Sequence, residues 1–147
     1  MEFISIQKLK TYSTNIAKKI KNGDAIYLYG EIGAGKTTFV RFLINYLQKK
    51  NKKKLEEIVS PTFTIVQYYK ISKEINIAHY DLYRIKKTKD LHNIGLSEQQ
   101  DSFINIVEWP ELIKTKSSHR IEIYLKHSRK INLRKIHVKY FGRFKNK

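Results

Sequence analysis

Residues 30–37 read Gly-Glu-Ile-Gly-Ala-Gly-Lys-Thr and match the phosphate-binding pattern G-x-x-x-x-G-K-[ST]. The glycines of this pattern let backbone N–H groups turn inward around phosphate oxygens. The ammonium group of Lys36 would reach the β and γ phosphates of a nucleotide, and the Thr37 hydroxyl would take a Mg²⁺ ion. The pattern therefore predicts a site for a nucleoside triphosphate and its metal ion.

Two carboxylates could complete this chemistry, because phosphoryl transfer needs acidic groups that hold the ion and position a nucleophile. Asp81 follows the apolar run at 75–80, and Glu108 follows the apolar run at 103–107. Ligands of open α/β sheets bind beyond the carboxyl ends of the strands, so both acids are expected to face the phosphates. One would hold the ion and the other would orient the attacking water; the residues alone do not say which. Either acid alone could instead cap a loop or pair with a lysine.

Three other features lie close to these residues in the sequence. The segment 60–64, Ser-Pro-Thr-Phe-Thr, resembles loops that sense a γ-phosphate through a threonine, although a plain turn would also explain it. Trp109 could stack on a base or a partner, or pack half-buried. His79 is interpreted as a structural polar residue rather than a metal ligand, because no cluster with ligand spacing accompanies it.

The elements around the loop agree with the motif. The short apolar run 25–29 reads as a buried strand, and 38–47 reads as a helix because it is long, apolar and free of Gly and Pro. A phosphate at the start of that helix would meet unpaired N–H groups and the positive end of the helix dipole. An earlier helix is expected over 5–21, with Gly23 as its left-handed cap.

The rest of the chain alternates between strand-like runs and turns. Residues 86–96 are expected to form a short helix or loop closed by Gly95, and a bulge is expected at Arg134–Lys135, where the alternation changes phase. We predict one compact α/β domain over 1–140, with a mixed sheet flanked by helices as in P-loop NTPases, and a basic tail at 141–147. The remaining strands are expected at 64–71, 74–83 (a hairpin with the first), 103–107, 120–125 and 130–140.

Composition limits the setting and the partners. The chain has 147 residues, no Cys, and neither a secretory signal nor a stretch that could span a bilayer, so we expect a cytoplasmic protein without disulfides. It carries 30 Lys and Arg against 13 Asp and Glu, a formal net charge of +17. This excess indicates either contact with tRNA or another polyanion, or the codon bias of an A/T-rich genome.

Four segments together resemble one known family. They are Gly-Glu-Ile-Gly-Ala-Gly-Lys-Thr-Thr-Phe (30–39), Ser-Pro-Thr-Phe-Thr-Ile-Val (60–66), His-Tyr-Asp-Leu-Tyr-Arg (79–84) and Val-Glu-Trp-Pro-Glu (107–111). In this order, and spanning residues 5 to 140, they resemble the TsaE family, formerly YjeE. The resemblance implies a P-loop ATPase needed for threonylcarbamoyladenosine in tRNA beside the anticodon. It also implies that ATP is hydrolysed while the protein is docked on a TsaD–TsaB pair, and only weakly without it.

The same resemblance implies ligands and site residues. ATP and Mg²⁺ would be bound, with Thr37 and Glu108 as ligands of the ion and Asp81 as the Walker B-like acid. Lys36, Asp81 and Glu108 would be the catalytic groups. Thr62 and Thr64 would lie in a switch-like loop, and Thr11 is a candidate for the adenine pocket. The phosphate contacts would be Gly33, Ala34, Gly35, Lys36, Thr37 and Thr38.

Two other function classes remain open from the sequence. A small-molecule kinase would need an acceptor pocket and usually an Arg-bearing lid, whereas the first half of the chain holds only Arg41 and no lid-like insertion. A basic RNA-binding module with a structural nucleotide would tolerate mutation of Lys36 wherever RNA binding survives.

Overall fold

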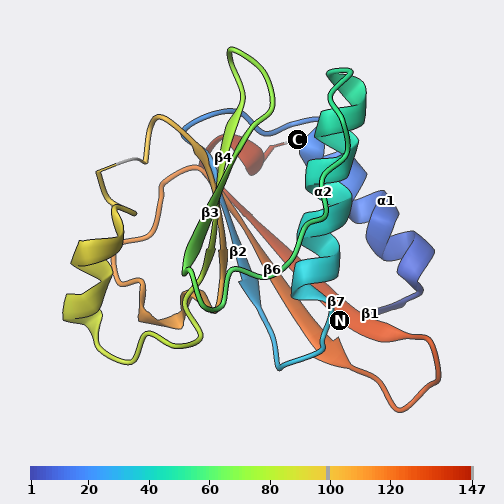
Figure 1. The fold of residues 1–147 in the computed structure, drawn as a ribbon. Helices are drawn as coiled ribbons and strands as arrows, with labels where there is room; N and C mark the ends of the chain where they lie inside the picture. Colours follow the sequence, from blue (N-terminus) through green and yellow to red (C-terminus); the bar gives the residue numbers. More distant parts are fainter. Residues whose placement is uncertain (99, 147) are drawn as a thin grey trace.

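The structure, a computed structural model, describes residues 1–98 and 100–146, which form one seven-stranded mixed sheet in the order β1-β7-β6-β2-β5-β4-β3 (Figure 1). Strands β6, β2, β5 and β4 run parallel, while β3, β7 and β1 each pair antiparallel with a neighbour. This arrangement confirms the predicted mixed sheet and the predicted hairpin. The strands are β1 (Glu2–Ile4), β2 (Ala25–Tyr29), β3 (Val66–Lys70), β4 (Asn76–Asp81), β5 (Ile104–Glu108), β6 (Arg120–His127) and β7 (Arg134–Phe141).

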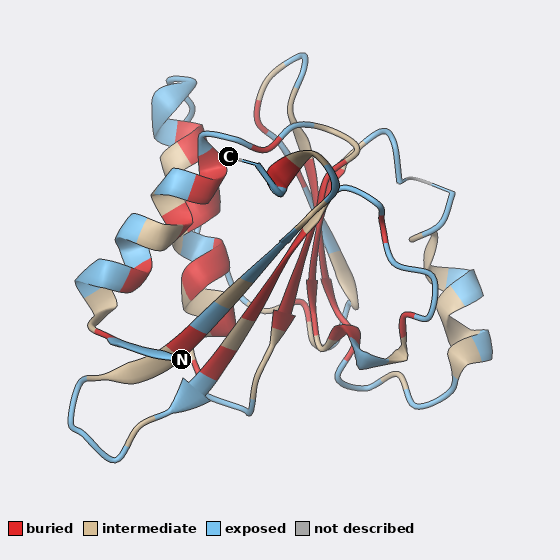
Figure 2. Cartoon of the chain, turned by 180° about the vertical axis from the view of Figure 1, so that it is seen from behind, coloured by how far each residue is buried: buried red, intermediate tan, exposed pale blue. Residues whose placement is uncertain are grey.

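Helices α1 (Ile6–Ala17) and α2 (Lys36–Lys50) lie together on one side of the sheet (Figure 1). The 3-10 segments η1 (Thr88–Ile94) and η2 (Pro110–Leu112), with their loops, lie toward the other side. Buried residues gather on the central strands and on the helix faces turned toward them (Figure 2). No helix among residues 1–98 and 100–146 is long and apolar enough to cross a membrane.

Helix α1 ends earlier than its hydrophobic pattern predicts. Ser5 caps its start, accepting a hydrogen bond from the backbone N–H of Lys8 at 3.2 Å. The helix stops at Ala17, and Gly23 is not its cap but part of the turn that follows. In that turn the Asp24 carboxylate accepts the backbone N–H of Lys21 at 2.8 Å. Such a side-chain hydrogen bond competes with continued helix, which explains the difference.

The end of the chain also differs from expectation. The register of β6 and β7 is continuous from Arg120↔Phe141 to His127↔Arg134, so the predicted bulge at Arg134–Lys135 is wrong. The change of phase in the alternation of apolar and polar residues at this point marks the start of β7 after the turn. Beyond residue 140 the chain is not a free tail, because Phe144 is buried in the core.

One basic side chain of this last segment, Arg143, has a defined partner. The Arg143 guanidinium donates to both carboxylate oxygens of Asp24, which is buried. Buried carboxylates need such partners, because an unpaired charge is costly to desolvate. The pair therefore holds the segment after β7 against the turn before β2.

A buried carboxylate on β6 provides a test of stability. Burial alone would raise the pKa of Glu122, but hydrogen bonds from Arg120, Tyr124 and Lys116 outweigh it and lower the pKa from 4.5 to about 2. The ionised Glu122 side chain therefore stabilises the folded state. This contribution to the free energy of unfolding is fully present above the unfolded pKa of 4.5 and is lost as the pH falls through the folded pKa of about 2. We therefore expect Glu122→Gln to melt at a lower temperature than wild type near neutral pH.

That difference should shrink as the pH falls from ~5 to ~2. Thermal unfolding of both proteins across this range measures it. An offset between their melting temperatures that did not change with pH would contradict the role given to the charge.

Candidate active site

A cavity of about 430 Å³ lies at the carboxyl ends of β2, β4 and β5. It brings together most of the residues that the sequence nominates, although they come from distant parts of the chain. Ala34 is buried and does not line the cavity. The nominated residues that line it are Gly33, Gly35, Lys36, Thr37, Thr38, Thr62, Asp81 and Glu108.

The loop between β2 and α2 has the shape of a phosphate cradle. Gly35 adopts φ +111° and caps α2 without a side-chain hydrogen bond, so the first N–H groups of the helix remain available to an anion. Gly30 passes so close to β6 that a Cβ there would overlap the backbone carbonyl oxygen of Leu125. Both glycines are thus required by the path of the loop.

Lys36 is held inside this loop. Its ammonium donates to the carbonyl oxygens of Gly30 and Glu31, the latter at 2.9 Å, and lies 4.1 Å from the centroid of the Trp109 ring. Burial lowers the pKa of Lys36, and the carboxylates of Glu108 and Asp81 oppose that shift. The ammonium is therefore partly desolvated. The neutral carbonyl oxygens balance its charge only in part, and the phosphates of a nucleotide would form stronger, charge-assisted hydrogen bonds with it.

Glu108 joins the loop to the sheet. Both of its carboxylate oxygens lie 3.0 Å from the Thr37 hydroxyl, which donates to them. On its other side, Nε2 of His79 lies 2.9 Å from Oε1 of Glu108, and both side chains are buried. His79 thus orients Glu108, in agreement with the structural role expected for it.

Asp81 has different partners. It is the neighbour of Glu108 in the β4–β5 register, as the shared sheet edge predicts. Its Oδ2 accepts hydrogen bonds from the hydroxyls of Ser60 and Thr62, the latter at 3.0 Å, and its Oδ1 accepts the backbone N–H of Tyr83 at 2.9 Å. Asp81 therefore anchors the 60–64 segment at the edge of the cavity, while Glu108 faces the phosphate-binding loop.

Two residues that follow site segments have left-handed backbone conformations. Trp109 adopts φ +59° directly after Glu108, and Ile65 adopts φ +69° directly after the 60–64 segment. Left-handed conformations of this kind cost of order 1–3 kcal/mol each and gather at functional sites. The Trp109 ring lies 4.8 Å from that of Tyr83, so this tryptophan is packed against an aromatic neighbour.

The donor set suits Mg²⁺ only together with a phosphate. Within residues 1–98 and 100–146 no group of three or more His, Asp or Glu side chains could hold a metal ion by itself. Mg²⁺ is typically bound by one or two carboxylates together with substrate phosphates and water. The Thr37 hydroxyl and the Glu108 carboxylate, already in contact, fit that requirement.

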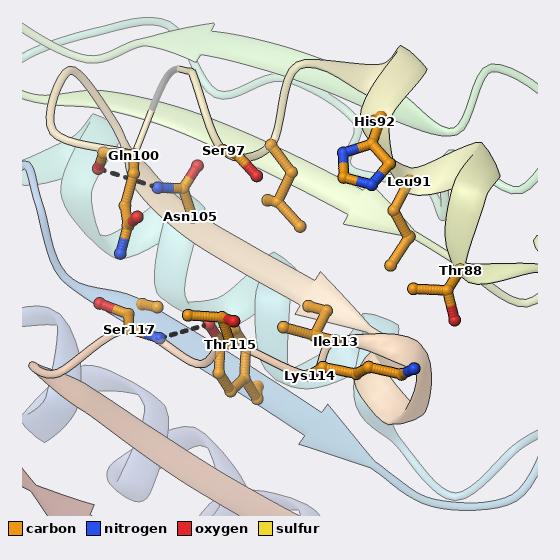
Figure 3. A pocket seen from close by; sticks show the side chains of 13 residues that line it. Thr88, Leu91, His92, Ser97, Gln100, Asn105, Ile113, Lys114, Thr115 and Ser117 are labelled. Atoms are coloured by element: carbon orange, nitrogen blue, oxygen red, sulfur yellow. Dashed lines mark hydrogen bonds between the residues drawn. The ribbon is translucent and has the colours of Figure 1, made fainter.

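Thr11 does not join this site. Its hydroxyl donates to the carbonyl oxygen of Gln7 within α1, and it does not line the cavity. A second cavity of about 300 Å³ lies over β2 and β5 and is closed by side chains of the segments 88–97 and 113–117 and by Gln100 (Figure 3). Asn105 and Ile113 line it, but none of the nominated residues does. Of these two cavities, only the first is lined by residues nominated for phosphate binding.

Sequence reasoning did not nominate Tyr83 and Arg134, which also line the first cavity. Tyr83 lies two positions after Asp81, within the His-Tyr-Asp-Leu-Tyr-Arg segment, so it could have been nominated. Arg134 is one of 30 basic residues and lies almost 100 positions from the phosphate-binding loop. Nothing local distinguishes it, and only the pairing of β7 with β6 brings it there.

Comparison with known proteins supports the family resemblance that the sequence motifs indicate. The sequence profile described as "Threonylcarbamoyl adenosine biosynthesis protein TsaE" matches residues 4–136. The chain belongs to the TsaE family. The match extends from β1 into β7 and contains every residue nominated for the site.

Individual TsaE relatives support the same family assignment. The chain is 38% identical over 110 residues to the tRNA threonylcarbamoyladenosine biosynthesis protein TsaE of Rickettsia prowazekii, covering 75% of this chain and 73% of that protein. It is 40% identical over 96 residues to the TsaE of Aquifex aeolicus, covering 65% of each. The crystal structure of YdiB from Bacillus subtilis superposes with a TM-score of 0.73 at 27% identity, covering 96% of this chain and 84% of that one. The fold is thus the P-loop-like α/β fold expected from the sequence.

Proposed function

We propose that this protein binds ATP with Mg²⁺ and hydrolyses it in support of threonylcarbamoyladenosine formation in tRNA, together with TsaD and TsaB homologues. One observation carries the proposal. The buried Glu108 carboxylate contacts the Thr37 hydroxyl of the phosphate-binding loop, and Lys36 lines the same cavity. Membership in the TsaE family supplies the pathway. Such work would place the protein in the cytoplasm.

The side chains have separable tasks in this proposal. Lys36 would exchange its contacts with loop carbonyls for phosphate oxygens and so offset their charge. Thr37 and Glu108 would hold Mg²⁺, which neutralises charge on the phosphates when bound. Asp81, through Ser60 and Thr62, would hold the 60–64 segment over the phosphate that leaves. His79 would keep the Glu108 carboxylate in position.

The test is ATP hydrolysis by the purified protein with and without TsaD and TsaB homologues, measured beside the yield of modified nucleoside in tRNA. We expect slow turnover alone, faster turnover with both partners, and modified tRNA only when all components are present. The Rickettsia and Aquifex relatives, named for this pathway, provide positive controls. Modified tRNA formed at full yield without this protein would refute the proposal.

The same preparation separates the alternatives. A kinase would transfer the phosphate to a nucleoside or metabolite rapidly and without partners. An RNA-binding module would support modification equally well with a nucleotide that cannot be hydrolysed. Either result would replace the ATPase proposal.

A further inference from the structure

Arg134 is the one basic side chain of the candidate site that the proposed function leaves without a role. It is the first residue of β7, and in the register it pairs with His127 at the end of β6. That end of β6 lies beside the carboxyl end of β2, from which the phosphate-binding loop departs. In the sheet, Arg134 therefore lies beside the phosphate-binding loop, on the side of β2 opposite to β5 and β4.

The contact between Arg134 and the loop is close. A Cβ built on Gly35 would lie 2.5 Å from Nη1 of Arg134 and 3.5 Å from its Cζ. The guanidinium thus occupies the space that a side chain at position 35 would need. Arg134 also lines the same 430 Å³ cavity as Lys36 and Glu108.

Within the part of the chain that the structure describes, the guanidinium has one buried donor without a partner and no ion pair. Its Nε is buried and has no hydrogen-bond partner among residues 1–98 and 100–146. In the same part of the chain, no Asp or Glu forms an ion pair with it. A buried donor without an acceptor costs stability, and the half-buried guanidinium has no carboxylate among the described residues to balance its charge. An anion bound in the cavity would satisfy both needs.

We propose that Arg134 is a nucleotide-binding residue that contacts the α and β phosphates. This inference rests on the proposed function, because it requires the cavity to bind a nucleotide. The acids Glu108 and Asp81 lie on β5 and β4, on one side of β2. In the proposed function these acids act where the γ-phosphate is cleaved. Arg134 lies on the other side of the loop, so it reaches oxygens that ADP and ATP share.

The proposal distinguishes Arg134 from a group that acts on the γ-phosphate. A group of that kind would strengthen the binding of ATP over ADP and would raise turnover. Arg134 should contribute equally to both nucleotides, since uniform binding changes KM and leaves kcat unchanged. A guanidinium also presents several donors in a rigid fork, which a lysine ammonium cannot reproduce.

The experiment measures equilibrium binding of ADP and of Mg·ATP through the fluorescence of Trp109, the only tryptophan of the chain. For Arg134→Ala we expect both affinities to fall together, by about ten- to a hundred-fold. Arg134→Lys should lose part of the affinity for both. Turnover at saturating ATP should remain near that of wild type.

Lys135→Ala is the matched control. It removes the same charge one position along β7, where the side chain lies 5.1 Å from the Phe3 ring and does not line the cavity. Its affinities should equal those of wild type. Thermal unfolding without nucleotide verifies that each variant is folded. If Arg134→Ala does not fold, the affinities of Arg134→Lys decide the test.

The outcomes separate the two proposals. If wild type binds neither nucleotide, the proposed function fails and this inference falls with it. If wild type binds both and the Arg134 variants bind equally well, this inference alone is refuted. A loss confined to ATP would also refute it, because it would place Arg134 at the γ-phosphate.

Discussion

Replacement of Lys36 by alanine should abolish ATP hydrolysis and, in the reconstituted reaction, the modification of tRNA. The ammonium lies inside the phosphate-binding loop and is partly desolvated, so its attraction to a phosphate is little weakened by water. Removing one preorganised charge-stabilising group often costs on the order of a hundred-fold in rate. Steady-state hydrolysis in the presence of both partner proteins measures the loss.

A second lysine of the same helix provides the control. Lys49 lies exposed in the last turn of α2, far along the helix from the loop, and Lys49→Ala also removes one positive charge. Its turnover should match that of wild type. Similar turnover in the Lys36 and Lys49 variants would contradict the role of Lys36. Melting temperatures of both variants show whether an altered fold contributes.

Substitution of the two acids should give two different defects. Glu108→Gln keeps the shape but removes the charge that faces Thr37, so we expect a loss of Mg²⁺-dependent turnover of at least about a hundred-fold. ATP should still bind, but Mg²⁺ should no longer strengthen its binding. Titrations of ATP with and without Mg²⁺, followed by Trp109 fluorescence, measure this difference.

Asp81→Asn should act through the 60–64 segment instead. It weakens the hydrogen bonds from Ser60 and Thr62, so turnover should fall while the effect of Mg²⁺ on ATP binding persists. Thr62→Val removes one of the same hydrogen bonds and should reproduce part of the Asp81 defect.

Glu111→Gln is the matched control for both acids, because Glu111 is exposed and lies three positions after Glu108. Its turnover and its response to Mg²⁺ should be those of wild type. Identical defects in the Glu108 and Asp81 variants would contradict the division of roles that their different partners indicate.

Much of the site could be predicted because its signals are local. The phosphate-binding loop is contiguous, and its flanking strand and helix were expected from apolar runs, so the positions of Lys36 and Thr37 followed directly. Asp81 and Glu108 could be placed at one sheet edge because each ends an apolar strand. Their separate roles could not be predicted, because these depend on which hydroxyls reach each carboxylate.

The parts that were missed depend on contacts between distant residues. Strand β1 is three residues long and exists through its pairing with β7, so the sequence has no pattern for it. The early end of α1 depends on a side-chain hydrogen bond in the following turn. The position of Arg134 depends on the register of β7, which the alternation at that point obscured.

The pairing of β1 with β7 has a consequence for synthesis on the ribosome. The strand Glu2–Ile4 cannot pair until the distant strand that ends at Phe141 has emerged. Domains fold as units during translation, and pairings between distant segments form slowly. A nascent chain would thus carry the complete phosphate-binding loop long before Arg134 and the sheet edge arrive, and that edge would remain open to aggregation in the interval.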